Sequence, residues 1–220
     1  MSLGAAGAGF DISGAGTDQT IGALSGVSGT NVALGDRTLT FGDATSQIFA
    51  GTIGGTGSII KQGSGTLTLS GASLFSGGIK IAAGGISIGP GGSLSSTNTV
   101  NLANSGTAFD ISAAGAQAIG SLAGAAGSQV NLGANALTFG DNSNVTFGGT
   151  IGGTGGIKKV GLGTQTLTGA NTFTGGTTID AGTLALGAGG SLAAGGSINL
   201  GAAGAGFDIS GEAAARPLEH

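Results

Sequence analysis

Short runs that alternate between apolar and polar or small residues recur along the whole chain. Examples are Val32-Ala33-Leu34, Leu67-Thr68-Leu69, Ile79-Lys80-Ile81, Ile86-Ser87-Ile88 and Leu184-Ala185-Leu186. A period of two is typical of β-strands, and the runs are bounded by Gly, Asn, Asp and Ser, which favour turns. The pattern therefore predicts an all-β chain of many short strands separated by tight turns.

Strands of three to five residues are too short for a β-sandwich. They suit a right-handed parallel β-helix (a solenoid), in which each coil lays short strands on those of the coil below and Gly forms the corners. At about 20 residues per coil, the chain makes about nine to eleven coils, and with strands about 4.8 Å apart its axis is roughly 45–50 Å long.

Self-comparison shows two tandem repeats of about 98 residues. The string FDIS starts at Phe10, Phe109 and Phe207, and residues 39–43 recur at 137–141. We therefore predict one β-helix segment over 1–211, with repeat one at 10–108, repeat two at 109–206 and the start of a third at 207–211. Residues 3–14 and 200–211 are identical, which indicates a piece of a longer array. Residues 212–220 are interpreted as a vector-derived tail, and no signal peptide is expected at the N-terminus.

Every one of the nine Phe residues has a counterpart in another copy. An aromatic patch built for one ligand need not be copied, whereas core residues would be, so we expect the Phe side chains to fill the same core layer in successive copies. They are Phe10, Phe41, Phe49, Phe75, Phe109, Phe139, Phe147, Phe173 and Phe207.

Composition narrows the class of protein further. Gly accounts for 52 of 220 residues, and the chain has no Cys, Trp or Tyr. A disulfide scaffold and a Cys-ligated zinc site are thereby excluded, and collagen is excluded because its Gly-x-y period is missing. The net charge of −4 and the dispersed cations argue against nucleic acid as a partner. No apolar run is long enough to span a bilayer as a helix.

The candidate chemistry is sparse. The β-helix also hosts polysaccharide-acting enzymes, but residues 1–211 offer eight Asp, no Glu and no His for acid–base work. Most of these Asp recur with the repeat (Asp11, Asp110 and Asp208; Asp43 and Asp141), which indicates turns. We therefore predict no enzyme, no catalytic, cofactor-binding or metal-binding residue, and no cofactor.

Three alternatives remain open at this stage. Asp141-Asn142-Ser143-Asn144 could supply oxygen ligands for calcium, although a structural turn is favoured. Gly152-Gly153-Thr154-Gly155-Gly156 resembles a phosphate-binding loop only weakly, since no helix follows. Thr-x-Thr triplets, at Thr38, Thr66, Thr164 and Thr166, could form an ice-binding or surface-binding Thr ladder, or simply flank buried Leu residues.

Residues 149–184, GTIGGTGGIKKVGLGTQTLTGANTFTGGTTIDAGTL, resemble the passenger-associated repeat of bacterial autotransporters. The family pattern runs in outline G-T-I-x-G-x-G-x-L-x-K-x-G-x-G-T-L-T-L-x-G-x-N-x-Y-x-G-G-T-x-I-x-x-G-T-L. Residues 51–86 follow it with departures: Ser73-Leu74-Phe75 replaces the Asn-x-aromatic step, Ile79-Lys80 replaces Thr-Thr, and Gly85-Ile86 replaces Thr-Leu.

This resemblance implies a cell-surface or secreted passenger of type V secretion, on the exterior of a Gram-negative outer membrane. In the family a parent chain links the passenger to an outer-membrane β-barrel, the repeat is thought to assist translocation and folding, and many members are adhesins associated with virulence. The implied partners are a host or abiotic surface, a glycan or an extracellular-matrix protein. We also expect end-to-end self-association, because cutting an array leaves coils uncapped.

Overall fold

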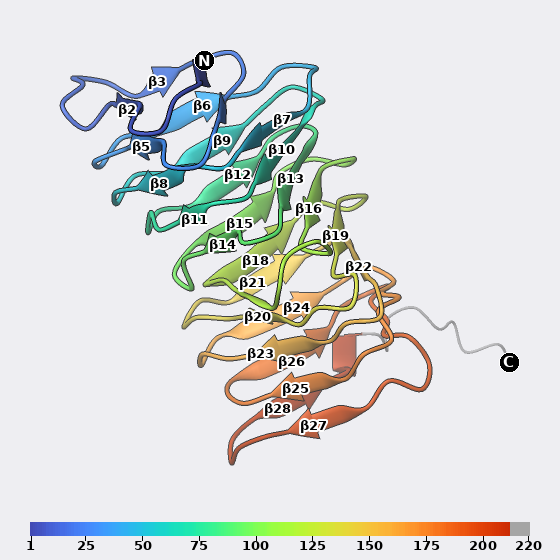
Figure 1. Ribbon diagram of the computed structural model, residues 1–220. Helices are drawn as coiled ribbons and strands as arrows, with labels where there is room; N and C mark the ends of the chain where they lie inside the picture. Colours follow the sequence, from blue (N-terminus) through green and yellow to red (C-terminus); the bar gives the residue numbers. More distant parts are fainter. Residues whose placement is uncertain (212–220) are drawn as a thin grey trace, which may run out of the picture.

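The computed structural model describes residues 1–211 as one continuous column of stacked coils, with the N-terminus at one end (Figure 1). Each strand pairs in parallel with strands of the coils before and after it, which confirms the predicted parallel β-helix. No α-helix occurs within residues 1–211. The predicted tail at 212–220 lies outside the described residues.

The strands line up into three faces that run along the column. Face 1 is an eight-stranded sheet, continued past its last strand by the bridge between Ala170 and Ser191. Its strands are β1 (Ser2–Leu3), β4 (Ser25–Gly26), β7 (Gln47–Phe49), β10 (Thr66–Leu69), β13 (Gly85–Ile88), β16 (Ala108–Asp110), β19 (Gln129–Asn131) and β22 (Thr150–Gly152).

Face 2 consists of two five-stranded sheets, one after the other, which meet where β14 contacts β17. The first has β2 (Gly9–Asp11), β5 (Asn31–Ala33), β8 (Thr52–Gly54), β11 (Ala72–Ser73) and β14 (Ser93–Leu94). The second has β17 (Gln117–Ala118), β20 (Leu137–Phe139), β23 (Ile157–Lys159), β25 (Thr177–Ile179) and β27 (Ile198–Leu200).

Face 3 is a ten-stranded sheet that includes strands from both ends of the column. It has β3 (Gln19–Thr20), β6 (Leu39–Phe41), β9 (Ile59–Lys61), β12 (Ile79–Ile81), β15 (Thr99–Leu102), β18 (Ser121–Gly124), β21 (Val145–Phe147), β24 (Thr164–Leu167), β26 (Thr183–Leu186) and β28 (Gly206–Asp208). Ten coils at about 4.8 Å per step give a column about 45 Å long.

Coil length varies along the column. Leu167 lies opposite Leu186, whereas Gly124 lies opposite Phe147, so the second of these coils contains more residues than the first. The extra residues lie in the corners, because each strand must keep its inward positions above those of the coil below.

The sequence repeat is not a whole number of coils. Fourteen strand positions separate β2 from β16, and three strands make a coil, so one copy spans four and two-thirds coils. Phe10, Phe109 and Phe207 therefore lie on three different faces, in β2, β16 and β28. The expectation that equivalent Phe side chains fill the same core layer in successive copies was wrong, because they lie on different faces of the column. Each copy is rotated by two-thirds of a turn about the axis relative to the copy before it.

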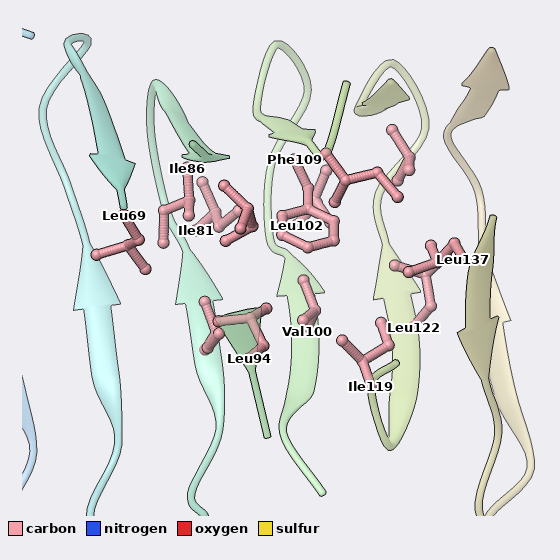
Figure 2. Close-up of a cluster of buried hydrophobic side chains, with 14 of the residues drawn as sticks. Leu69, Ile81, Ile86, Leu94, Val100, Leu102, Phe109, Ile119, Leu122 and Leu137 are labelled. Carbon is pink, nitrogen blue, oxygen red and sulfur yellow. The ribbon is translucent and has the colours of Figure 1, made fainter. Parts of the chain in front are cut away.

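Local pairing is nevertheless preserved between copies. Phe10 lies opposite Val32, and Phe109 lies opposite Val130, one repeat further on. Phe109 also has Ile86 on its other side, as the stacked side chains of Figure 2 show. Each position therefore keeps its neighbours along the axis while it changes face.

The core is a narrow apolar strip inside the column. Inward side chains alternate with outward ones, and the inward ones are nearly all Leu, Ile, Val or Phe. Seven of the nine Phe are at most 2% exposed, and Phe10 and Phe207 pack partly buried against the same core. The aromatic rings are therefore structural, as predicted.

Glycine is required at corners where successive coils approach closely. Gly42 has a φ of 117°, in the left-handed region that other residues avoid. At Gly57 a Cβ atom would lie 1.9 Å from the backbone oxygen of Arg37 in the coil before it. This close approach explains much of the glycine content.

Candidate functional site

Two lysine side chains are buried at equivalent corners of the two copies. Lys61 ends β9 on face 3 and is 2% exposed, and Lys159 ends β23 on face 2 and is 1% exposed. Each occupies an inward position between apolar partners, Phe41 and Ile81 in the case of Lys61. The aliphatic stem therefore belongs to the core, and only the ammonium group needs polar partners.

Backbone oxygens supply those partners in the same way in both copies. Lys61 Nζ donates to the oxygens of Gln62 (2.8 Å), Gly63 (2.9 Å) and Ala83 (3.4 Å). Lys159 Nζ donates to those of Val160 (2.6 Å), Gly161 (2.8 Å) and Ala181 (3.3 Å). An ammonium group has three donors, and all three are used here.

Each of these sites connects consecutive coils, and we call it a lysine corner. For Lys61 two acceptors belong to its own corner and the third, Ala83, to the corner of the next coil. Burial lowers the pKa of Lys61, opposed by the carboxylate of Asp43 in the preceding coil. Burial likewise lowers the pKa of Lys159, opposed by Asp141. The three hydrogen bonds join two successive corners, and they leave no ammonium donor for a ligand.

The lysine corners were not predicted from the sequence, where the lysines were taken only as dispersed cations. A signal was present, because Lys61 and Lys159 are repeat equivalents and follow Ile59 and Ile157 at the spacing of inward positions. A charge at a predicted core position in both copies is what could have revealed them.

The buried amide of Asn171 performs a similar task, which its equivalent residue in copy one does not. Asn171, 3% exposed, accepts from the backbone N–H of Ile151 (3.0 Å) and donates to the oxygens of Gly169 (2.9 Å) and Ser191 (3.0 Å). These three groups belong to three successive coils. The equivalent in copy one is Ser73, whose buried Oγ has no hydrogen-bond partner.

The aspartates form turns, as the sequence indicated. Asp11, Asp43, Asp110, Asp141 and Asp208 each accept a hydrogen bond from the backbone N–H two residues further on. Hydrogen bonds from Ser13, Thr45 and Ser210 lower the pKa of Asp11, Asp43 and Asp208 respectively.

The other three aspartates lack repeat equivalents. Asp18 accepts from the backbone N–H of Thr38 (2.8 Å). Asp36 lies beside Arg37 at 3.3 Å, and Asp180 pairs with Lys158 at 2.6 Å. All eight carboxylates therefore have a partner within the column.

The two loop candidates are occupied by contacts between coils. Asn142 and Asn144 accept from the backbone N–H groups of Leu162 (3.4 Å) and Thr164 (2.8 Å) in the next coil. In the Gly-rich loop, the N–H groups of Thr154 and Gly155 donate to the oxygen of Gly133 in the preceding coil. A structural turn thus accounts for both segments, and within residues 1–211 no group of three or more Asp, Glu or His residues is placed to hold a metal ion.

The Thr triplets point outward and form only short rows. Thr40 stands between Thr20 and Ile60 on face 3, and Thr68 stands between Ile48 and Ser87 on face 1. The residue between two Thr is buried, as with Leu67 at 2% exposure. The triplets therefore flank buried residues, as the simpler interpretation predicted.

The fold and its corners define a class: a long parallel β-helix stabilised by contacts between neighbouring coils. Among residues 1–211, no helix has the length and apolarity to cross a membrane. No solved structure matches the chain significantly. One sequence family and one known protein sequence do match it.

Residues 59–88 and 157–186 match the passenger-associated-transport-repeat family. The chain is also 35% identical over 134 residues to the adhesin BmaC autotransporter of Brucella suis biovar 1 (strain 1330), covering 57% of this chain and 4% of that protein. Residues 59–88 and 157–186 are thus two passenger-associated transport repeats, as the resemblance implied. The matched segments begin and end slightly later than the resemblance at 51–86 and 149–184, and both contain a lysine corner.

Proposed function

We propose that the chain is a structural and adhesive segment of an autotransporter passenger, acting as a cell-surface stalk or as part of an adhesin. The support comes from the two matched repeats, from the adhesin relative and from a column about 45 Å long. The chain spans 4% of the length of that relative, so the activity of a whole parent protein forms part of this proposal.

The observation that carries the proposal is how each matched segment folds. Within residues 59–88, β9 pairs with β12 and β10 pairs with β13, and Lys61 reaches Ala83. One matched segment therefore contains two strand pairs between successive coils together with the lysine corner that joins those coils. Stacking through nearest-neighbour contacts suits a chain that folds coil by coil after export, and a chain without Cys forms no disulfide before it crosses the membrane.

The outward side chains are suited to many weak contacts rather than to one deep site. A row on face 1 runs Thr68, Ser87, Asp110 and Asn131, opposite one another in successive coils. Short polar side chains spaced about 4.8 Å apart could contact a host or abiotic surface, a glycan or an extracellular-matrix protein. The passenger would be linked to an outer-membrane β-barrel.

A non-enzymatic role agrees with the adhesin relative and with the transport-repeat family. Each of the eight carboxylates within residues 1–211 engages a backbone N–H group or a neighbouring cation. A polysaccharide-acting enzyme, the alternative, would turn over members of a broad glycan panel, and such turnover by the purified chain would displace our proposal.

The test displays the chain on a non-adherent Gram-negative host, between a signal peptide and an outer-membrane barrel, with an epitope tag at its N-terminus. A host that displays the tag directly on the barrel is the control. We expect the tag to be accessible to antibody on intact cells, and more cells to be retained on collagen, on immobilised glycans or on bare polystyrene than with the control.

The two parts of the proposal are separable in this assay. An accessible tag without extra retention would overturn the adhesive role and leave the stalk. A tag that never reaches the surface, although the control tag does, would overturn the passenger role itself.

A further inference from the structure

The stacking of short, similar strands leaves the choice of register weakly determined. Ile59 and Lys61 point inward in one coil, and Ile79 and Ile81 point inward in the next. A slip of one residue would turn these apolar side chains outward, but a slip of two keeps the inward and outward pattern. The two-residue slip is therefore the nearest competing structure.

The lysine corner responds to such a slip, whereas the alternation of inward and outward positions does not. The Lys61 residue makes three hydrogen bonds to the next coil. Its backbone oxygen accepts from the N–H groups of Ala82 (2.7 Å) and Ala83 (3.3 Å), and its ammonium donates to the oxygen of Ala83 (3.4 Å). A shift of two residues moves these groups by about 6.6 Å along the strand. The ammonium would then remain buried with one donor unpaired, a costly arrangement for a charged group.

The same contacts form on different faces of the column. Lys61 lies on face 3 and Lys159 on face 2, yet both ammonium groups make the same three hydrogen bonds, at 2.8, 2.9 and 3.4 Å for Lys61 and at 2.6, 2.8 and 3.3 Å for Lys159. The geometry is thus a property of the local sequence rather than of one face.

We propose that Lys61 and Lys159 are register-setting residues: each ammonium joins the corner of its own coil to the corner of the next and disfavours the two-residue slip. This inference deepens the proposed structural role of the repeat. It is independent of adhesion, and its test uses the purified, refolded chain, so that it can fail while surface display succeeds.

Register can be measured by disulfide formation, because the chain has no native Cys. Thr68 lies opposite Ser87 in the native register, so Thr68→Cys with Ser87→Cys reports the native state. Thr66→Cys or Ser70→Cys with Ser87→Cys reports a slip of two residues in either direction. Directly opposed Cα atoms lie within disulfide range and diagonal ones do not. Free thiols are counted after refolding, oxidation and denaturation.

With Lys61 present, we expect only the Thr68→Cys and Ser87→Cys pair to close. In Lys61→Met, which keeps the stem and loses the ammonium, closure of a slipped pair should rise roughly tenfold, the equilibrium worth of one hydrogen bond to a charged group. Lys80→Met is the matched control, because Lys80 is exposed on the neighbouring strand, and it should leave the pattern unchanged.

Closure of the native pair alone in both Lys61 and Lys61→Met chains would overturn the proposal. Should Lys61→Met lose its β-sheet circular dichroism, Lys61→Arg provides the second test. Lys61→Arg keeps a buried cation, so the native pair should close in it. If Lys61→Met is unfolded and Lys61→Arg shows no more slipped closure than Lys80→Met, the proposal is supported. Slipped closure that is higher with Arg than in the Lys80→Met control would overturn it.

Discussion

The buried amide of Asn171 and the buried hydroxyl of Ser73, its equivalent in copy one, offer a reciprocal swap within one chain. Asn171→Ser removes the three hydrogen bonds that Asn171 makes to groups of three successive coils. At about 0.5–1.5 kcal/mol for each, the free energy of unfolding should fall by about 1.5–4.5 kcal/mol. The new hydroxyl would be as unpaired as that of Ser73.

Ser73→Asn should act in the opposite direction. The acceptors of Asn171 are the oxygens of Gly169 and Ser191, and their equivalents in copy one are Gly71 and Ser93, one repeat earlier. An amide at position 73 can therefore find the same partners, and the free energy of unfolding should rise by about 1 kcal/mol. The double variant should show the sum of the two effects, because the sites share no partner.

The assay is urea unfolding followed by far-UV circular dichroism, since the chain has no Trp or Tyr to serve as a fluorescence probe. Asn101→Ser is the control: Asn101 points outward from β15, and its replacement should change the stability by less than about 0.5 kcal/mol. A loss of stability in Asn171→Ser no larger than in Asn101→Ser would contradict the prediction. So would a Ser73→Asn variant that is less stable than the parent chain.

Four further outcomes are expected. Gly57→Ala should lower the free energy of unfolding by about 1–3 kcal/mol, because the added Cβ would meet the backbone oxygen of Arg37. Gly54→Ala is the control, because a Cβ at that position has no other atom within 4 Å. Equal urea midpoints for the two variants would contradict this prediction. Burial lowers the pKa of Lys61 and Lys159, so at pH values just below the usual lysine pKa the unfolded state binds more protons than the folded state. The free energy of unfolding should therefore rise with pH in this range. A Lys61→Met and Lys159→Met double variant with the same rise would contradict the prediction. A chain with a third copy should melt higher than the present one, as each added coil interface stabilises its neighbours; an unchanged melting temperature would count against the stalk. The predicted end-to-end association should appear in sedimentation at several concentrations, and a strict monomer at high concentration would rule it out.

The sequence predicted the features that depend on local chemistry. Alternation and corner glycines indicated a parallel β-helix, and the repeated Asp43 and Asp141 indicated turns, because a carboxylate that accepts a hydrogen bond two residues on is a local arrangement. The burial of Phe109 followed from its recurrence. These inferences need only a few neighbouring residues.

The sequence did not reveal the features that depend on coil length. Coils differ in length, as the pairing of Leu167 with Leu186 and that of Gly124 with Phe147 show. The length of each coil depends on how its corners pack against those of the neighbouring coils. A single period in the sequence therefore does not predict it. The lysine corner was also missed, although a charge that recurs at an inward position in both copies was a signal for it. Lys61 meets Ala83 in the next coil, and only the stacked structure shows that a backbone oxygen lies there to accept from the ammonium group.

The mismatch between repeat and coil bears on what the segment can do. A copy of four and two-thirds coils carries each outward feature to another face, so that three copies would span fourteen coils and return to the first face. Thr68 on face 1 thus has its equivalent, Thr166, on face 3. An adhesive feature encoded once per repeat would face all three directions around the axis, and a surface could be contacted from any side of the rod. The interior contacts tolerate this rotation because each of them, from the lysine corner to the pairing of Phe109 with Val130, involves only adjacent coils. A repeat of this kind can therefore lengthen a stalk without any change in how one coil meets the next, while it distributes its outer surface evenly around the column.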